Sequence, residues 1–362
     1  MPDRRAFLGQ AAASLAGLYA GPVLAADSGF VPLGQVARAH GLQFGFALDP
    51  RRLSDARYAA FVAQQASLVV PENALKWAAT HPAPDHYDFG PADTIASFAR
   101  SHGIAMRGHT FCWHRSLPAW VTQTVTRQNA EAVLVDHIQT VAGHYRGMIH
   151  SWDVANEVIN LADNLPGGWR DCFWHQMLGP AYVEIAAHAA HQADPGALLC
   201  YNDYGLESDS DKAQAKRKAV LAMLQGLKQR GVPIGGLGLQ SHLRAGGSDS
   251  FGPGLAQFIQ EVRGLGLTVL ITELDVDDSK LDPATSDGVV AGVYKRYLDL
   301  VLGTGAVSAV LTWGVWDTPH YTAATPGQSG PMAQRPLAFG PDGSLKDASW
   351  AVEHCLMRAR KV

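Results

Sequence analysis

The amino-acid sequence alternates between short apolar runs and longer stretches with helical spacing. Eight short runs rich in apolar residues begin near residues 42, 66, 104, 148, 197, 236, 267 and 306. Between two of them, the stretch 126–145 has an apolar face at helical spacing, with charged residues opposite: Ala130, Val133, Leu134, His137, Ile138 and Val141. The short runs predict buried strands, and the stretches between them predict helices.

Eight strand–helix units in a chain of 362 residues predict a protein of the α/β class with a single (β/α)8 TIM barrel. The alternative is an open, doubly wound sheet, which is expected to carry a phosphate-binding glycine loop after an early strand. No G-x-G-x-x-G pattern follows an early strand, and no G-x-x-x-x-G-K-[ST] pattern occurs. The barrel is therefore favoured, with its active site at the C-terminal ends of the strands.

The first 26 residues differ from the rest of the chain. Arg4 and Arg5 precede a weakly apolar stretch of small residues that ends at Ala26. This pattern is typical of a twin-arginine export signal with a small-residue cleavage site, whereas a frayed amphipathic helix would not need the paired arginines. We therefore expect residues 1–26 to be an export signal, residues 27–362 to form the barrel, and the mature protein to be secreted or periplasmic.

The amino-acid composition and the net charge limit the kinds of partner that the protein is expected to bind. A hydrophobic content of 47 % with 17 % charged residues fits a globular protein. The net charge of −4 gives no electrostatic reason to bind nucleic acid or an anionic membrane. After the N-terminal segment no apolar run approaches the roughly 20 residues of a spanning helix. We therefore expect a neutral ligand, and neither nucleic acid nor membrane as a partner. We also expect the protein to be a monomer.

The cysteines are scattered and form no C-x-x-C pair, so buried free thiols are favoured over a disulfide. They are Cys112, Cys172, Cys200 and Cys355.

Polar and aromatic residues stand where the second to the eighth predicted strands end, so a barrel should gather them on one face. They are Glu72, Asn73, Lys76, His109, Trp113, His114, Asn156, Glu157, Asn202, Asp203, Tyr204, Gln240, His242, Glu273, Asp275, Trp313, Trp316 and Asp317. Many hydrogen-bonding groups beside aromatic rings suit a neutral polyhydroxylated ligand, a sugar. Neither an H-E-x-x-H metal pattern nor a G-x-S-x-G serine elbow occurs, so we expect no metal and no cofactor.

Two glutamates, Glu157 and Glu273, each close an apolar run. A carboxylate at a strand end can simply pair with a lysine or an arginine. However, Asn156 precedes Glu157, and Asp275 follows two residues after Glu273, and this crowding of polar groups indicates a working site. The two carboxylates suit the acid and the nucleophile that cleave a glycosidic bond.

Eight motifs follow one another along the chain. They are PENALKW at 71–77, RGHTFCWH at 107–114, LPAWV at 117–121, WDVANE at 152–157, YNDYGLE at 201–207, GLQSHL at 238–243, ITELD at 271–275 and TWGVWD at 312–317. With these motifs the chain resembles the family 10 glycoside hydrolases from about residue 34 to residue 356. The resemblance implies a (β/α)8 endo-1,4-β-xylanase, which hydrolyses internal β-1,4 linkages of xylan or xylo-oligosaccharides with retention, by double displacement.

The resemblance also implies roles for individual residues. Glu157 would be the general acid/base, and Glu273 would be the nucleophile. Asn156 would bind the 2-hydroxyl of the reacting sugar, and His242, bridged to Asp275, would orient Glu273. The remaining positions would bind sugar hydroxyls and rings: Glu72, Asn73, Lys76, His109, Trp113, Tyr204, Gln240, Trp313 and Tyr321.

The chain departs from the family pattern at a few positions. Tyr321 stands where the family usually has a second tryptophan after the eighth strand, while Ala78 and His81 replace acidic residues. These departures bear on the preferred sugar more than on the type of reaction. Two alternatives stay open at this point: a retaining β-glycosidase or cellulase of the same barrel type, and a non-catalytic sugar-binding barrel.

Overall fold

The computed structural model describes residues 29–246, 250–318 and 334–359. Within these ranges, nine parallel strands form one sheet in the order β6-β5-β4-β3-β2-β1-β9-β8-β7, and a further pairing of β6 with β8 closes the sheet into a barrel. The strands are β1 (Gln43–Leu48), β2 (Leu68–Pro71), β3 (Ala105–Cys112), β4 (Ile149–Asn156), β5 (Leu198–Asp203), β6 (Gly236–Leu239), β7 (His242–Arg244), β8 (Thr268–Asp277) and β9 (Val307–Thr312).

Each of the eight predicted apolar runs contains a strand, so the (β/α)8 prediction is confirmed. The sixth run differs in one respect, because it is divided into β6 and β7. The division falls at Gln240 and Ser241, where Ser241 has a φ of 64°, in the left-handed region that interrupts a regular strand. Beyond it, β7 continues beside β8.

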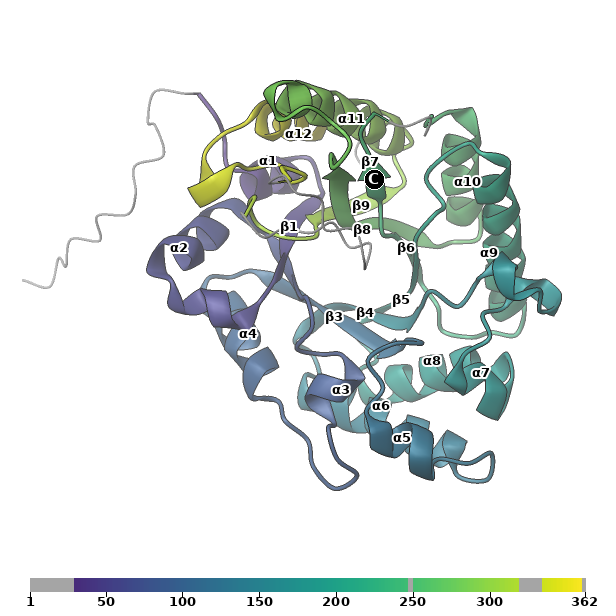
Figure 1. Ribbon diagram of the computed structural model, residues 1–362. Helices are drawn as coiled ribbons and strands as arrows, with labels where there is room; N and C mark the ends of the chain where they lie inside the picture. Colours follow the sequence, from purple (N-terminus) through teal and green to yellow (C-terminus); the bar gives the residue numbers. More distant parts are fainter. Residues whose placement is uncertain (1–28, 247–249, 319–333, 360–362) are drawn as a thin grey trace, which may run out of the picture.

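Helices alternate with the strands along the chain, beginning with α1 before β1, and form an outer ring around the barrel (Figure 1). They are α1 (Leu33–Ala39), α2 (Ala56–Gln65), α3 (Trp77–Thr80), α4 (Gly90–Ser101), α5 (Ala119–Thr124), α6 (Ala130–His144), α7 (Phe173–Leu178), α8 (Ala181–Ala193), α9 (Asp211–Gln229), α10 (Pro253–Gly264), α11 (Pro283–Gly303) and α12 (Asp347–Met357). Asp55, Ser210 and Asp282 begin α2, α9 and α11, because their side chains accept hydrogen bonds from backbone N–H groups of the first turn.

The interior of the barrel holds a small apolar cluster separate from the main core between sheet and helices. Because side chains alternate between the two faces of a strand, one set points into the barrel and forms this cluster. Its members are Ala47, Leu68, Val70, Cys200, Leu270, Ala309 and Leu311. Farther along β3 and β4, Arg107 and Asp153 form a fully buried ion pair with 2.5 Å between Nη2 and Oδ1. An apolar layer therefore gives way to a charged layer toward the strand ends.

Some sequence predictions concern residues outside the described ranges. These are the export signal at residues 1–26, Tyr321, and most of the loop that follows β9, the strand of the eighth predicted run. All four cysteines are described, and each is buried and free, as expected. No helix in the described part of the chain is long and apolar enough to cross a bilayer.

Candidate active site

Both glutamates lie on the C-terminal face of the barrel, one at the end of β4 and one on β8, with β5 and β6 between these two strands. Glu157 directly follows β4, and Glu273 lies within β8. The register of β8 against β9 shifts between Ile271 and Leu274, an irregularity of the kind that redirects side chains beside active sites. Both glutamates are nearly buried, with 9 % and 5 % of their surface exposed.

Glu273 is held as an anion. Its Oε1 accepts a hydrogen bond from Asn202 Nδ2 at 2.8 Å, and its Oε2 lies 3.1 Å from His242 Nε2. Burial opposes ionisation, but the hydrogen bond with His242, the charges of His109 and His242 and the bond from Asn202 outweigh it, and they lower the pKa of Glu273 to about 2. A carboxylate in this state can attack an electrophilic carbon.

His242 stands between two carboxylates. Its Nδ1 lies 3.0 Å from Asp275 Oδ1, and the two residues are partners in the pairing of β7 with β8. Burial favours the neutral ring, yet Asp275 and Glu273 outweigh burial and raise the pKa of His242 well above its ordinary value. Both ring nitrogens therefore donate, one to each carboxylate.

Glu157 has a different environment, and its backbone has a φ of 58°. Its Oε1 accepts from two amides, Gln240 Nε2 at 3.1 Å and Asn156 Nδ2 at 3.3 Å. Two basic side chains lie farther from its Oε2, with His114 Nδ1 at 3.6 Å and Arg170 Nη2 at 4.0 Å. Burial and the charge of Arg170 lower the pKa of His114 to about 4, so this ring is neutral at pH 7.

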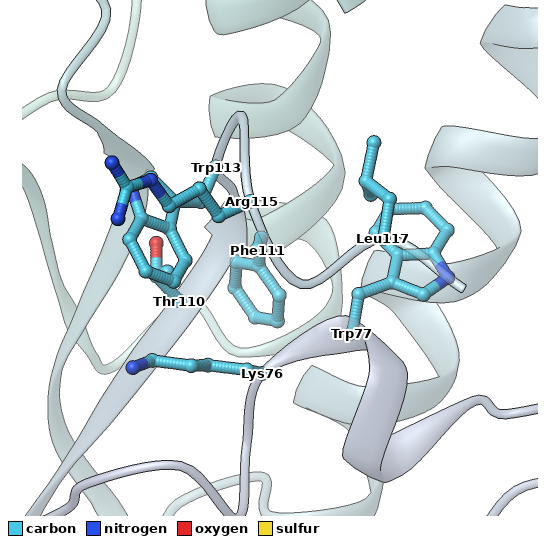
Figure 2. Close-up of a pocket in the computed structure, with 7 residues that line it drawn as sticks. All are labelled: Lys76, Trp77, Thr110, Phe111, Trp113, Arg115 and Leu117. Carbon is cyan, nitrogen blue, oxygen red and sulfur yellow. The ribbon is translucent and has the colours of Figure 1, made fainter. Parts of the chain in front are cut away.

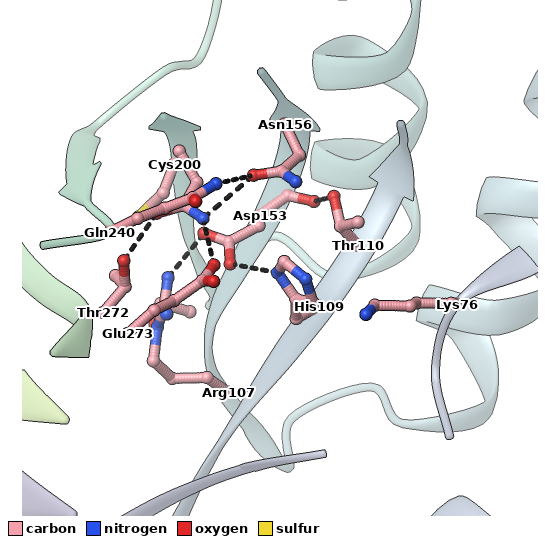
Figure 3. A network of polar contacts seen from close by, with 12 residues as sticks. Lys76, Arg107, His109, Thr110, Asp153, Asn156, Cys200, Gln240, Thr272 and Glu273 are labelled. Carbon is pink, nitrogen blue, oxygen red and sulfur yellow. Dashed lines mark hydrogen bonds and ion pairs between the residues drawn. The ribbon is translucent and has the colours of Figure 1, made fainter. Parts of the chain in front are cut away.

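An amide network connects the two glutamates: Asn156 and Gln240 bind Glu157, and Asn202 joins Asn156 to Glu273. Figure 3 shows Asn156, Gln240 and Glu273 in this network. Asn156 Oδ1 accepts from Asn202 Nδ2 at 2.9 Å and from Gln240 Nε2 at 3.2 Å. Reversing the Asn156 amide would offer its oxygen to the Trp113 indole N–H but would turn its nitrogen against these two donors. Thr272 Oγ1 donates to Asn202 Oδ1 at 2.7 Å, so Asn202 is oriented from both ends.

Gly238 makes room for this network. A Cβ atom at position 238 would lie 2.2 Å from Asn202 Oδ1 and 2.9 Å from Thr272 Cγ2. Both distances are shorter than any van der Waals contact, so the Asn202 amide can take its place only because residue 238 is glycine.

Below the glutamates, His109 belongs to the charged layer of the barrel. Its Nδ1 lies 2.9 Å from Asp153 Oδ2, while Arg107 binds the other oxygen of the same carboxylate (Figure 3). Arg107 Nε also donates to Ser151 Oγ at 2.9 Å. This arrangement fixes the orientation of the His109 ring.

Lys76 lies between two indole rings. Its Nζ is 4.7 Å from the ring centre of Trp113 and 5.7 Å from that of Trp313, and it donates to Asn73 Oδ1 at 2.9 Å. Burial outweighs the attraction of the nearby glutamates and lowers the pKa of Lys76. Figure 2 shows Lys76 and Trp113 on the wall of a shallow pocket, whose lining residues are Lys76, Trp77, Thr110, Phe111, Trp113, Arg115 and Leu117.

Two other predicted binding residues, Tyr204 and Glu72, lie at the rim. Tyr204 follows β5 and is 40 % exposed, with Lys216 Nζ 4.1 Å from its ring centre. Glu72 follows β2, and its Oε1 accepts from Asn73 Nδ2 at 3.1 Å. Tyr321 lies outside the described residues, so its relation to this rim is not described.

Several residues that complete the site have no role predicted from the sequence. Asn202 stood at a predicted strand end, and Arg107 and Asp153 lie inside the RGHTFCWH and WDVANE motifs, so a signal for these three was present. Arg170 lies in an irregular segment without any signal. Among the described residues, no group of three or more His, Cys, Asp or Glu side chains could hold a metal ion.

The fold and the paired carboxylates agree with comparisons to known proteins. A model of glycosyl hydrolase family 10 matches residues 32–355. Endo-1,4-beta-xylanase B of Thermotoga neapolitana is 34 % identical over 310 residues, which are 83 % of this chain and 85 % of that protein. Endo-1,4-beta-xylanase 2 of Claviceps purpurea is 34 % identical over 338 residues, 93 % of this chain and 94 % of that protein.

A solved structure agrees as well. Xylanase 10B from Thermotoga petrophila RKU-1, in complex with xylobiose, has a TM-score of 0.82 and 31 % identity, covering 91 % of this chain and 98 % of that one. The protein is therefore a glycoside hydrolase of the (β/α)8 barrel type. It belongs to glycosyl hydrolase family 10, which confirms the resemblance seen in the motifs.

Proposed function

We propose that this protein is an endo-1,4-β-xylanase that cleaves β-1,4-xylan and xylo-oligosaccharides with retention. The observation that carries the proposal is the unequal environment of the two glutamates. Glu273 is bound by a charged imidazole and has a pKa of about 2, whereas the side chain of Glu157 accepts from neutral amides. Support for xylose as the sugar comes from relatives named xylanases and from the xylobiose complex of one of them.

In the first step, Glu157 donates its proton to the glycosidic oxygen while Glu273 attacks the anomeric carbon. The bond to the leaving sugar breaks, and a covalent glycosyl-enzyme forms on Glu273. His242 and Asp275 hold Glu273 ionised and oriented for this attack. Asn156 binds the 2-hydroxyl of the reacting sugar, an interaction that strengthens in the oxocarbenium-like transition state.

In the second step, Glu157 removes a proton from water, and the resulting hydroxide oxygen attacks the anomeric carbon from the side opposite Glu273. The ester bond breaks, and Glu273 leaves as a carboxylate, so two inversions give net retention. Lys76, His109 and Gln240 bind hydroxyls near the cleavage point. The remaining binding residues contact sugar rings or more distant hydroxyls: Glu72, Asn73, Trp113, Tyr204, Trp313 and Tyr321.

The test measures reducing ends released from soluble xylan, turnover of aryl xylobioside against aryl cellobioside, and the anomer of the first product by NMR. We expect release from xylan, faster turnover of the xylobioside and a β-product. An α-product contradicts the retaining mechanism, and faster turnover of the cellobioside indicates a glucanase. Retarded migration in a xylan gel without any release of sugar indicates a sugar-binding barrel.

We also propose that residues 1–26 direct export by the twin-arginine route and that the mature enzyme is a secreted or periplasmic monomer. The support is the Arg4-Arg5 pair before a weakly apolar stretch of small residues. When both arginines are replaced with lysine, the enzyme should no longer be exported, and its activity should be found in the cytoplasmic fraction. Light scattering of the exported protein should give the mass of one chain. Unchanged export of the double variant contradicts the assigned route.

A further inference from the structure

Arg170 contacts the backbone of Glu157 and approaches its carboxylate. It lies between the short helix η3 (Pro166–Gly168) and α7, and its own N–H donates to Val158 O at 2.7 Å. A bridge between Ile159 and Trp169 fastens the same segment. From this position, Arg170 Nε donates to the carbonyl oxygen of Glu157 at 2.5 Å.

Glu157 requires support of this kind. Its φ of 58° places a non-glycine residue in the left-handed region, which persists only where the surroundings hold it. Its N–H donates to Asn202 O at 2.9 Å. Arg170 satisfies the carbonyl, so one bond on the N–H and one on the carbonyl fix the conformation from which the carboxylate extends.

The same guanidinium reaches the rim of the site. Arg170 Nη2 donates to Tyr204 Oη at 3.2 Å and lies 4.0 Å from Glu157 Oε2. The Arg170 side chain is only 11 % exposed. A guanidinium is rigid and planar. The Glu157 carbonyl, the Glu157 carboxylate and the Tyr204 hydroxyl all lie around this one group, so their positions depend on one another.

We propose that Arg170 is the positioning residue of the acid/base. It holds the backbone and the carboxylate of Glu157 in line with the glycosidic oxygen and links them to the Tyr204 ring, where the leaving sugar stacks. This inference rests on the proposed function of Glu157. Arg170 exchanges no proton with the substrate, so its loss should impair proton transfer and spare the attack by Glu273.

The experiment compares two aryl β-xylobiosides. Phenol leaves only with a proton from Glu157, whereas 2,4-dinitrophenol leaves without one. For Arg170→Met we expect kcat/KM to fall about 100-fold with the phenyl glycoside and less than about 5-fold with the dinitrophenyl glycoside. Arg170→Lys should recover part of the loss, because an ammonium group can replace one of the donors. Arg230→Met is the matched control, since Arg230 forms an exposed pair with Glu184 away from the site.

Azide gives a second readout that a merely structural residue would not change. Azide attacks the glycosyl-enzyme without help from a base. If Glu157 is misplaced in Arg170→Met, azide should accelerate turnover of the dinitrophenyl glycoside and yield the β-glycosyl azide. Wild type and Arg230→Met should show neither effect.

An equal loss with both glycosides, or a higher KM with unchanged kcat, overturns the positioning role. Thermal unfolding identifies a misfolded Arg170→Met, and in that case Arg170→Lys, measured with the same pair of glycosides, decides. A wild type that cleaves neither glycoside contradicts the proposed function and this inference together. An active wild type, with a variant loss that does not depend on the leaving group, contradicts this inference alone.

Discussion

His242 Nε2 lies 3.1 Å from Glu273 Oε2, and this contact keeps a buried carboxylate ionised. For His242→Gln we expect the acid limb of kcat/KM to move to higher pH by about one to two units, because a lost charged hydrogen bond corresponds to that shift. The direction follows from the requirement for an anionic nucleophile: burial, then less opposed, raises the pKa of Glu273. Asp275→Asn should move the limb in the same direction by less. An acid limb that stays at its wild-type position in both variants contradicts the proposed role of His242.

The two glutamates should fail in different ways. Glu273→Ala should lower kcat roughly 10⁴-fold or more with every substrate, because no covalent intermediate can form. Glu157→Ala should slow xylan hydrolysis by about 10² to 10⁴-fold and should spare glycosylation by a dinitrophenyl glycoside. Stopped-flow measurement of phenolate release separates the two steps. Full xylan turnover by Glu273→Ala would refute the assignment of the nucleophile.

The buried pair of Arg107 and Asp153 should matter to stability. Arg107→Met leaves Asp153 without its strongest partner, and removing one member of a buried pair costs about 3 to 5 kcal/mol. Urea unfolding followed by tryptophan fluorescence measures the free energy of unfolding. Arg230→Met, which breaks the exposed pair with Glu184, should cost less than about 1 kcal/mol. Similar losses in the two variants contradict this account.

Acid should destabilise the protein through His81 and His137. Their Nδ1 atoms lie 3.3 Å apart, and the His137 ring stacks on Trp77 with ring centres at 3.6 Å. Since His81 Nε2 faces Pro84 O, this tautomer offers its Nδ1 as the acceptor for His137. Burial lowers the pKa of both rings below their ordinary 6.5, so the folded pair is neutral.

The sign of the pH dependence follows. Below about pH 6.5 the two histidines bind protons in the unfolded chain but stay neutral in the folded protein. As the pH decreases, the free energy of unfolding should therefore fall by up to about 1.4 kcal/mol per pH unit for each ring. Urea unfolding between pH 7.5 and 4.5 measures the slope. His81→Gln should give a shallower slope, and His188→Gln, at an exposed position of α8, should match wild type. An unchanged slope in His81→Gln excludes this pair as the source.

The strands of this fold could be predicted because buried parallel strands are short apolar runs. The break between β6 and β7 could not be predicted, because the pattern of apolar residues does not indicate the left-handed backbone conformation of Ser241. For the same reason the register shift beside Glu273 was not foreseen. Hydrophobic periodicity reports which side chains are buried, but it does not report local backbone conformation.

Residues of the site could be predicted where topology brings them together. Glu157, Glu273 and His242 follow or lie within barrel strands, whose C-terminal ends must converge. Arg170 lies 13 residues after Glu157 in an irregular segment, and only the path of that segment returns its guanidinium to Glu157. His137, by contrast, fell on the predicted apolar face of its helix, and the structure buries it there.

Position 238 limits how far this enzyme can be redesigned. No sugar needs to touch Gly238, yet any larger residue there would displace the Asn202 amide that joins Asn156 to Glu273. A mutant library designed only around the residues that face the substrate would not identify position 238 as important for activity. An engineer should instead keep it invariant, because this glycine in β6 sets the alignment of the two glutamates.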